Sequence, residues 1–265
     1  MASSLASDLE ALRGLRIFFG HQSVGANILE GLRTLTARTP DALTISELRE
    51  TAGTNAASAP ASATEQITRD APRPAPLLLH ARVGRNEAPS SKCEAFSQIL
   101  DEGGAGRVDL AVLKFCYVDI GAATDVEALA ASYVGCLDAL GHRHPDTAFV
   151  PVTAPLRQTP GGPGVWAREF LGRTNHTKAA NARRHAYNVQ LRRQYTGRPL
   201  FDLAASQCTG PDGGRETFSF GGEAMESLRA GYTNDGGHLN AAGQAVAAAE
   251  FVRSLAMAAR IRRPR

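Results

Sequence analysis

The chain of 265 residues is predicted to form an α/β fold, a three-layer sandwich in which a five-stranded parallel sheet lies between helices. Short, almost entirely apolar runs of the kind that form buried strands alternate along the chain with longer segments that have helical apolar spacing. Hydrophobic residues make up 43% of the chain and charged residues 21%, which is typical of a globular protein. No repeat of about 20 to 50 residues is visible, so a solenoid is excluded.

Five apolar runs predict the strands. They are residues 17–19, 77–83, 108–117, 147–153 and 199–203. The run at 108–117 is apolar at nearly every position, as expected of a central strand that is buried on both faces.

Five longer segments have apolar residues at the spacing of an amphipathic helix. They are residues 24–35, 91–100, 125–140, 179–195 and 241–257. Asp125 and Asn240 stand where the third and the last of these helices begin, and both are residue types that cap a helix N-terminus with a side-chain oxygen.

Two segments follow neither pattern. Residues 51–76 are rich in Ala, Ser, Thr and Pro, and residues 154–177 begin with a run of Pro and Gly, which break both helices and strands. We expect both to be loop insertions in a single domain, residues 1–265, which ends in a basic tail at 259–265.

Charge and composition exclude several classes of partner. The chain has 29 basic and 26 acidic residues, and its net charge of +3 arises mainly at 183–193 and in the tail. We expect the first of these stretches to be the solvated face of a helix, and without a recognition motif no nucleic-acid partner is expected. The four cysteines are widely spaced, with no Cys-x-x-Cys pair and no short Cys/His ligand spacing, so neither a zinc site nor a disulfide framework is indicated. Cys116 is predicted to be a small buried side chain.

Neither a targeting segment nor a membrane span is expected. The first ten residues include acids where a signal peptide would need an apolar stretch, and no run of about 18 apolar residues occurs. The expected location is therefore the cytoplasm, without membrane association.

Residues at the two ends of the chain could form a hydrolytic site. Asp235 and His238 stand three residues apart, just before the last predicted helix, and Ser23 follows the first predicted strand. A serine hydroxyl becomes a nucleophile when a base takes its proton and a third group orients that base. Each residue also has an ordinary structural interpretation, since Ser23 could simply cap a helix and Asp-Gly-Gly is a strong turn former.

The sequence resembles the SGNH/GDSL hydrolase superfamily over residues 14–258. Asp235-Gly-Gly-His238, continued by Leu239-Asn-Ala-Ala-Gly243, matches the family's Asp-x-x-His block, and Gly20-His21-Gln22-Ser23 stands where the family has Gly-Asp-Ser. The resemblance implies a flavodoxin-like fold, with Ser23 as nucleophile, His238 as general base and Asp235 as its orienter. The first block is one residue longer than Gly-Asp-Ser, and His21 within it is either a second site histidine or a structural one under a tight turn.

The third block departs further from the family pattern. Cys116-Tyr-Val-Asp119 replaces Gly-x-Asn-Asp, so the asparagine that would bind the oxyanion is missing. We predict that the oxyanion hole consists of the backbone N–H groups of Ser23 and Gly84 and the side chain of Asn86. Tyr117 is the alternative donor, or else an aromatic residue at a strand end. Asp119 is expected to cap or to form an ion pair, with Lys92 or Lys114.

The expected function is that of a serine esterase without metal or organic cofactor. Through an acyl-enzyme, it would hydrolyse a small O-acyl ester of a carbohydrate or metabolite, an O-acetyl ester being the first candidate by family analogy. Two alternatives stay open: an O-acyltransferase with the same triad, and a binding protein without activity on the same fold. The two loop insertions would wall the site, and Trp166, the only tryptophan, would either stack on a sugar ring or anchor its loop.

Overall fold

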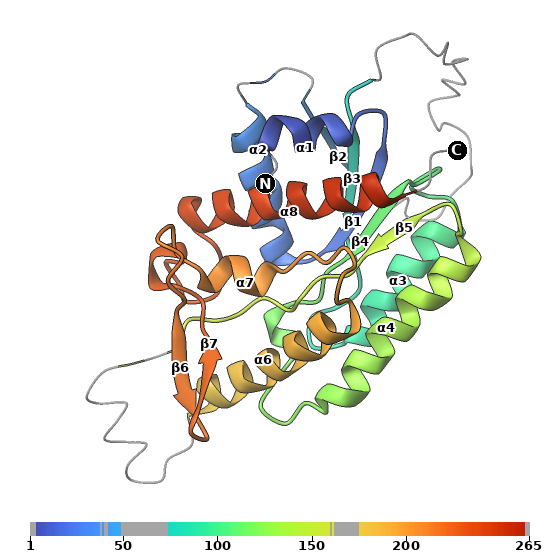
Figure 1. Cartoon of the computed structure of the whole chain (residues 1–265). Coiled ribbons are helices and arrows are strands. Elements are labelled where there is room, and N and C mark those ends of the chain that lie inside the picture. Colours follow the sequence, from blue (N-terminus) through green and yellow to red (C-terminus); the bar gives the residue numbers. More distant parts are fainter. Residues whose placement is uncertain are drawn as a thin grey trace.

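A five-stranded, entirely parallel sheet forms the centre of the fold, in the order β2-β3-β1-β4-β5 (Figure 1). The computed structural model describes residues 4–37, 39, 42–48, 74–159, 161 and 175–262. The strands are β1 (Arg16–His21), β2 (Thr44–Glu47), β3 (Leu77–Arg82), β4 (Leu110–Leu113) and β5 (Ala148–Val150). The predicted sheet of five parallel strands between helices is confirmed.

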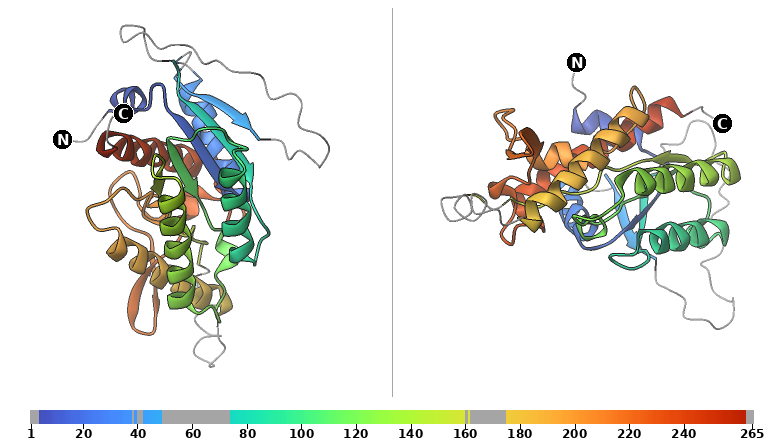
Figure 2. Two further views of the ribbon diagram at one scale, coloured as in Figure 1. Left: turned by 90° about the vertical axis from the view of Figure 1, so that its right-hand side faces the viewer. Right: turned by 90° about the horizontal axis from the view of Figure 1, so that it is seen from below.

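Helices cover both faces of this sheet (Figures 1 and 2). They are α1 (Leu5–Ala11), α2 (Ser23–Thr36), α3 (Pro89–Asp101), α4 (Val126–Arg143), α6 (His176–Gln194), α7 (Leu203–Cys208) and α8 (Ala241–Ile261). Two short 3-10 helices, η1 (Tyr117–Asp119) and η2 (Ala230–Tyr232), lie in the connections. No helix among these described elements is both long and apolar enough to cross a membrane.

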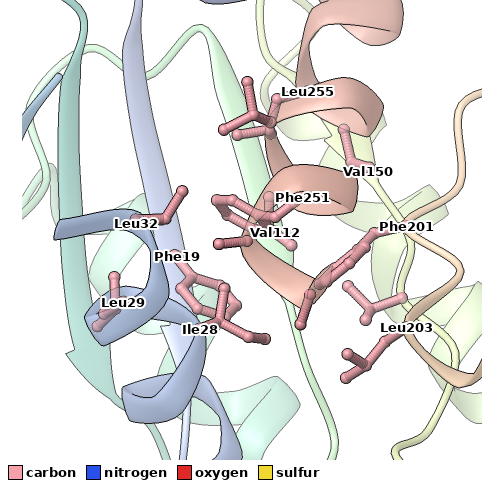
Figure 3. Close-up of a cluster of buried hydrophobic side chains, with 14 of the residues drawn as sticks. Phe19, Ile28, Leu29, Leu32, Val112, Val150, Phe201, Leu203, Phe251 and Leu255 are labelled. Atoms are coloured by element: carbon pink, nitrogen blue, oxygen red, sulfur yellow. The ribbon is translucent and has the colours of Figure 1, made fainter. Parts of the chain in front are cut away.

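The two faces of the central strand β1 carry separate hydrophobic cores. Phe19 packs with Ile28 of α2 and Phe251 of α8 on one face (Figure 3). Phe18 points to the other face, where its ring stacks on Phe96 of α3 at a centroid distance of 5.1 Å. Adjacent residues of a strand face opposite sides of the sheet, so Phe18 and Phe19 anchor one helical layer each, on opposite faces.

The predicted helices are confirmed, including their N-terminal caps. The Asp125 side chain accepts a hydrogen bond from Ala128 N (3.0 Å), and the Asn240 side chain accepts from Ala242 N and Gly243 N (3.1 and 3.2 Å). Helix α8 continues to Ile261, so the first residues of the expected basic tail are helical instead.

Two of the predicted strands are corrected. Residues 199–203 were expected to be the fifth strand, but they contribute only one isolated parallel bridge, Phe201 to Val152, before α7 begins at Leu203. The strand expected at 108–117 is shorter, because the chain leaves the sheet after Leu113 and turns into η1.

Five described α-helices and strands were not predicted, namely β2, α1, α7 and the two strands of a hairpin. The fifth strand is β2 at the sheet edge, where its residues are mostly exposed and polar, so it lacks the apolar run of a buried strand. Helix α1 was also missed. An antiparallel hairpin, β6 (Thr217–Phe220) and β7 (Glu223–Glu226), turns through Gly221 and Gly222, which both have positive φ. A two-residue Gly-Gly turn is a recognisable hairpin signal.

The predicted loops lie mostly outside the described residues. Of 51–76 only residues 74–76 are described, and of 154–177 only 154–159, 161 and 175–177. Helix α6 begins at His176, within the second expected loop. Trp166 lies outside the described residues.

The close contact between α2 and α8 depends on Gly31. A Cβ at this position would lie 2.3 Å from the backbone oxygen of Gln244, which cannot move without α8. We expect Gly31→Ala to lower the free energy of unfolding by about 1–3 kcal/mol, the usual cost of overpacking. Equilibrium urea denaturation would measure it.

Gly135 in α4 provides the matched control, since nothing lies within 4 Å of a Cβ built there. Gly135→Ala should raise the free energy of unfolding by about 0.5–1 kcal/mol through helix propensity. Equal effects of the two substitutions would show that the α2–α8 contact is not tight at Gly31.

Candidate active site

The segments that follow β1, β3 and β4 meet at the carboxyl edge of the sheet. In parallel α/β folds this edge forms the ligand crevice. The three segments are residues 21–23, 83–87 and 114–119, and the turn at 235–238 lies against the third of them. All residues predicted for the site are on these four segments.

Asp235 and His238 form the paired acid and base that their spacing predicted. His238 Nδ1 lies 2.6 Å from Asp235 Oδ2, while Asp235 Oδ1 accepts from the backbone N–H groups of His238 (2.7 Å) and Gly237 (2.9 Å). The hydrogen bond from the His238 side chain, followed by these two backbone bonds, lowers the pKa of Asp235. Gly236, at a φ of 79°, closes the turn. The two residues therefore form both a hydrogen-bonded turn and an acid–imidazole pair.

Two contacts fix the turn against the rest of the site. Leu239 N donates to Asn27 Oδ1 at 3.1 Å, and Asn27 lies one helical turn after Ser23 in α2. On the other side, the His238 ring packs edge-on against Tyr117, with 5.9 Å between the ring centroids. A side chain at Gly237 would collide with the Tyr117 ring, 3.1 Å from the position of its Cβ.

Ser23 is the first residue of α2, where free backbone N–H groups and the helix dipole favour negative charge. The N-cap is Gln22, so Ser23 does not have the capping role considered for it. The only hydrogen-bonding contact of Ser23 Oγ among the described residues is Cys116 Sγ, at 3.8 Å. Ser23 thus lies beside Cys116, and His238 lies beside Tyr117, the residue that follows Cys116 in sequence. No Ser23–His238 hydrogen bond is formed among the described residues.

The loop after β3 is attached to the start of α2. Gln22 Nε2 donates to Val83 O (3.0 Å) and Gly84 O (2.9 Å). Gly84 has a φ of 58°, and a Cβ there would lie 2.5 Å from Lys92 N, so only glycine fits. Gly84 is therefore held next to the residue that precedes Ser23.

A buried ion pair joins the second and third blocks. Lys92 Nζ pairs with Asp119 Oδ2, and both side chains are inaccessible to solvent. Asp119 also accepts from Cys116 N (2.6 Å) and Glu87 N (2.9 Å). The expected ion pair of Asp119 is confirmed with Lys92. Lys114 instead donates to Phe115 O (2.9 Å), and burial lowers its pKa to about 8.

Asn86 and Tyr117, the two alternative oxyanion donors, both keep a donor available. Asn86 Oδ1 accepts from Lys92 Nζ at 3.2 Å, which fixes the amide orientation, and no partner of Nδ2 occurs among the described residues. Tyr117 is half-buried, and desolvation followed by the neighbouring Cys116 raises its pKa, so its hydroxyl keeps its proton. Neither residue is excluded by the geometry.

His21 has a structural place beneath the first turn of α2. Its Nδ1 lies 2.9 Å from Gln22 O and its Nε2 lies 3.2 Å from His80 Nδ1. A neutral imidazole has one donor and one acceptor, so His21 donates from Nδ1 and accepts at Nε2. Burial lowers the pKa of His21 to about 3, despite the bond to Gln22 O. Both ring nitrogens are thus used inside the fold.

Two arginines that sequence analysis did not select stand beside Tyr117. The Arg157 guanidinium lies over the Tyr117 ring, 5.4 Å from its centroid, and Arg184 Nε donates to Tyr117 O at 2.9 Å. Arg184 is only 4% exposed, which corrects the expectation that the basic stretch 183–193 is a solvated face. Within that stretch Arg183 and Arg193 are exposed, as expected. Helical spacing alone could have distinguished buried Arg184 from exposed Arg183 and Arg193, because Arg184 shares a helix face with buried Tyr187 and Leu191.

The described residues include no group of three or more His, Cys, Asp or Glu side chains arranged to hold a metal ion. Cys116 is buried, as predicted, and it also lies next to Ser23. The chemistry available at this edge is therefore that of an acid–imidazole pair, a serine at a helix N-terminus and several N–H donors.

Comparison with known proteins gives distant structural similarity only. Neither a protein-family model nor a curated protein matches this sequence. The fold is similar to a Streptococcus pneumonia chain provisionally described as a platelet activating factor, with 13% identity and a TM-score of 0.49 over 95% of this chain and 91% of that chain. It is also similar to the periplasmic domain of a lipopolysaccharide acetyltransferase from Salmonella ser. Paratyphi A, with 9% identity and a TM-score of 0.44 over 96% and 90%. Neither similarity decides an activity for this chain.

The buried His21 should make stability depend on pH. Unfolded histidine binds a proton near pH 6.5, whereas folded His21 does so only near pH 3, so between these values the unfolded state holds more protons. The free energy of unfolding therefore falls as pH falls through this window, by up to about 1.4 kcal/mol per pH unit from this residue.

We expect His21→Gln to make this dependence shallower by up to about one proton. Urea denaturation at several pH values between about 4.5 and 7 would measure both slopes. A slope that is the same in His21→Gln and in the unsubstituted protein would contradict the assignment of His21 as a buried neutral base.

Proposed function

We propose that the protein is a serine hydrolase of ester bonds, with Ser23 as nucleophile, His238 as general base and Asp235 as its orienter. The observation that carries the proposal is the 2.6 Å contact between His238 Nδ1 and Asp235 Oδ2, in a turn attached through Asn27 to the helix that begins at Ser23. This bond keeps the proton on Nδ1 and leaves Nε2 as the free base.

The reaction would proceed in two steps. Ser23 Oγ attacks the ester carbonyl while His238 Nε2 takes the hydroxyl proton and then passes it to the leaving alcohol. Water attacks the acyl-enzyme with His238 again as base, and the acid is released. Hydrogen bonds in catalytic sites are often long before substrate binds, so the absent Ser23–His238 bond is compatible with these roles.

The tetrahedral intermediate needs donors around its oxyanion. We infer that these are the backbone N–H groups of Ser23 and Gly84 and the side chain of Asn86. The support is the Gln22 attachment, which holds Gly84 beside the start of α2, and the Lys92 bond, which leaves the Asn86 amide N–H groups unused. A small O-acyl ester of a carbohydrate or metabolite, such as an O-acetyl ester, is the substrate proposed.

The nucleophile is tested first. Ser23→Ala should reduce kcat for p-nitrophenyl acetate by about 10⁴-fold or more and abolish labelling by a fluorophosphonate probe, since the attacking oxygen is gone.

Asp235→Asn should reduce kcat about 10⁴-fold, because an amide cannot keep the imidazole in the required tautomer.

Ser206→Ala, which removes another half-buried serine, serves as the control and should leave the rate unchanged. Unsubstituted protein that neither hydrolyses the ester nor is labelled at Ser23, as read by mass spectrometry of the labelled peptide, would refute the enzyme and favour a binding role. An O-acylated acceptor in place of free acid, when a sugar or metabolite hydroxyl is supplied, would identify the O-acyltransferase instead.

The oxyanion donor is tested by comparing Asn86→Ala with Tyr117→Phe. Loss of one such donor costs about 10²–10³-fold in kcat in other enzymes, with little effect on KM. We expect that loss for Asn86→Ala and less than about 10-fold for Tyr117→Phe. Steady-state kinetics in which Tyr117→Phe has the larger effect would transfer the role to the tyrosine.

A further inference from the structure

Two arginines at the candidate site have no acidic partner. Among the described residues, no carboxylate lies within 4.0 Å of the guanidinium of Arg157 or Arg184. Arg184 has only neutral acceptors, Tyr117 O (2.9 Å) and Asn181 Oδ1 (2.8 Å). Arg157 Nε is buried and has no hydrogen-bond partner in the described part of the chain.

A second arginine of the same helix is paired, in contrast to Arg184. Arg192, two helical turns after Arg184 in α6, is also partly buried, and it pairs with Asp202 at 2.7 Å and with Glu226 at 3.0 Å. Burying a charge is costly unless it is paired, so an unpaired arginine next to a second arginine calls for an explanation. Burial and then the charge of Arg157 lower the pKa of Arg184 to about 10.

Both cations contact Tyr117, Arg157 at its ring and Arg184 at its backbone oxygen, and the Tyr117 ring contacts the proposed base. Arg157 lies over the Tyr117 ring, and the His238 ring packs edge-on against the same ring. The next residue, Gln158, donates its backbone N–H to Gly236 O at 2.9 Å, so this segment borders the Asp235–His238 turn. Asp235 is a nearby carboxylate, but its oxygens are occupied by His238, Gly237 and Thr233.

We propose that Arg157 binds an anionic group of the substrate, a carboxylate or a phosphate, while buried Arg184 adds positive potential from behind Tyr117. The inference rests on the proposed function and deepens it, since it makes the substrate an acyl ester that carries a negative charge close to the ester bond. Arg157 is the binding residue because its side chain is only partly buried and no hydrogen bond of its guanidinium is formed among the described residues. The Arg184 guanidinium already donates to Tyr117 O and Asn181 Oδ1, so Arg184 is a positioning residue.

Matched acetate esters test this specificity. 4-Acetoxyphenylacetate and 4-acetoxybenzylphosphonate carry the two candidate anions, and 4-acetoxyphenylacetamide is their neutral counterpart, with a CH₂ group that keeps the leaving phenols similar. We expect kcat/KM of the unsubstituted protein to be about 10-fold or more higher for at least one anion than for the amide, a modest value for one arginine–anion contact. The better of the two anions identifies the group.

Arg157→Gln should reduce this preference to near unity through KM, and Arg157→Lys should retain part of it. Arg193→Gln is the charge-matched control, because it removes an exposed arginine from α6 about 13 Å further along the helix than Arg184. It should keep the full preference.

The outcomes distinguish a failure of the anion-binding inference from a failure of the proposed esterase function. No preference for either anion, a preference that survives in Arg157→Gln, or equal losses on neutral and anionic esters would overturn the inference and leave the esterase standing. Hydrolysis of none of the three esters would count against the esterase instead. The anion site is then tested by calorimetry on Ser23→Ala, with and without Arg157→Gln. The ligands are 4-hydroxyphenylacetate, 4-hydroxybenzylphosphonate and 4-hydroxyphenylacetamide. If neither anion binds more tightly when Arg157 is present, the inference of an anion site is wrong.

Discussion

The buried ion pair between Lys92 and Asp119 is the interaction on which the geometry of the candidate site depends. The Asp119 carboxylate accepts from Lys92, from Cys116 N and from Glu87 N, so one side chain joins the loop after β3 to the loop after β4. Glu87 is the one described non-glycine residue with a left-handed φ, 63°, a conformation that costs about 1–3 kcal/mol and persists where surrounding bonds hold it. Removal of either member of such a pair leaves a buried charge and typically costs about 3–5 kcal/mol. A protein retains such an expensive arrangement most readily where it fixes a functional geometry, and here it fixes the orientation of Asn86.

The acid–base pair is built on a different principle. Asp235 and His238 are brought together by a four-residue turn, and the hydrogen bonds that join the two residues lie within that turn, so their mutual geometry is local. Their position relative to Ser23 is not local, because it depends on Asn27 of α2 and on the Tyr117 ring. The proposed site therefore combines a locally formed acid–imidazole pair with a proposed nucleophile and donors whose placement depends on the whole sheet edge.

This difference explains how much of the molecule could be predicted from sequence. Helices with clear periodicity and caps, such as α4 after Asp125, and the Asp235–His238 pair are encoded over a few residues, and both were predicted. Strand β2 was missed because an exposed edge strand needs no apolar run, whereas Phe201 lies in such a run yet forms only one bridge. The burial of Arg184 could have been predicted from helical spacing, but the position of Arg157 and Arg184 beside Tyr117 could not, since it arises from the packing of a loop and a helix distant in sequence. The choice between Lys92 and Lys114 as the partner of Asp119 likewise required the fold.

The remaining step concerns the Ser23 hydroxyl. Its present neighbour is Cys116 Sγ, at 3.8 Å, and a thiol is a weak hydrogen-bond donor and acceptor, so little free energy holds Oγ there. His238 Nδ1 is hydrogen-bonded to Asp235, which leaves Nε2 as a stronger acceptor for a hydroxyl at this edge than the thiol of Cys116. A serine changes its hydroxyl direction by moving between staggered χ1 rotamers, without any change in the backbone. Since α2 and the Asp235–His238 turn are joined through Asn27, the proposed Ser23–His238 hydrogen bond would form between two segments that are already attached to each other.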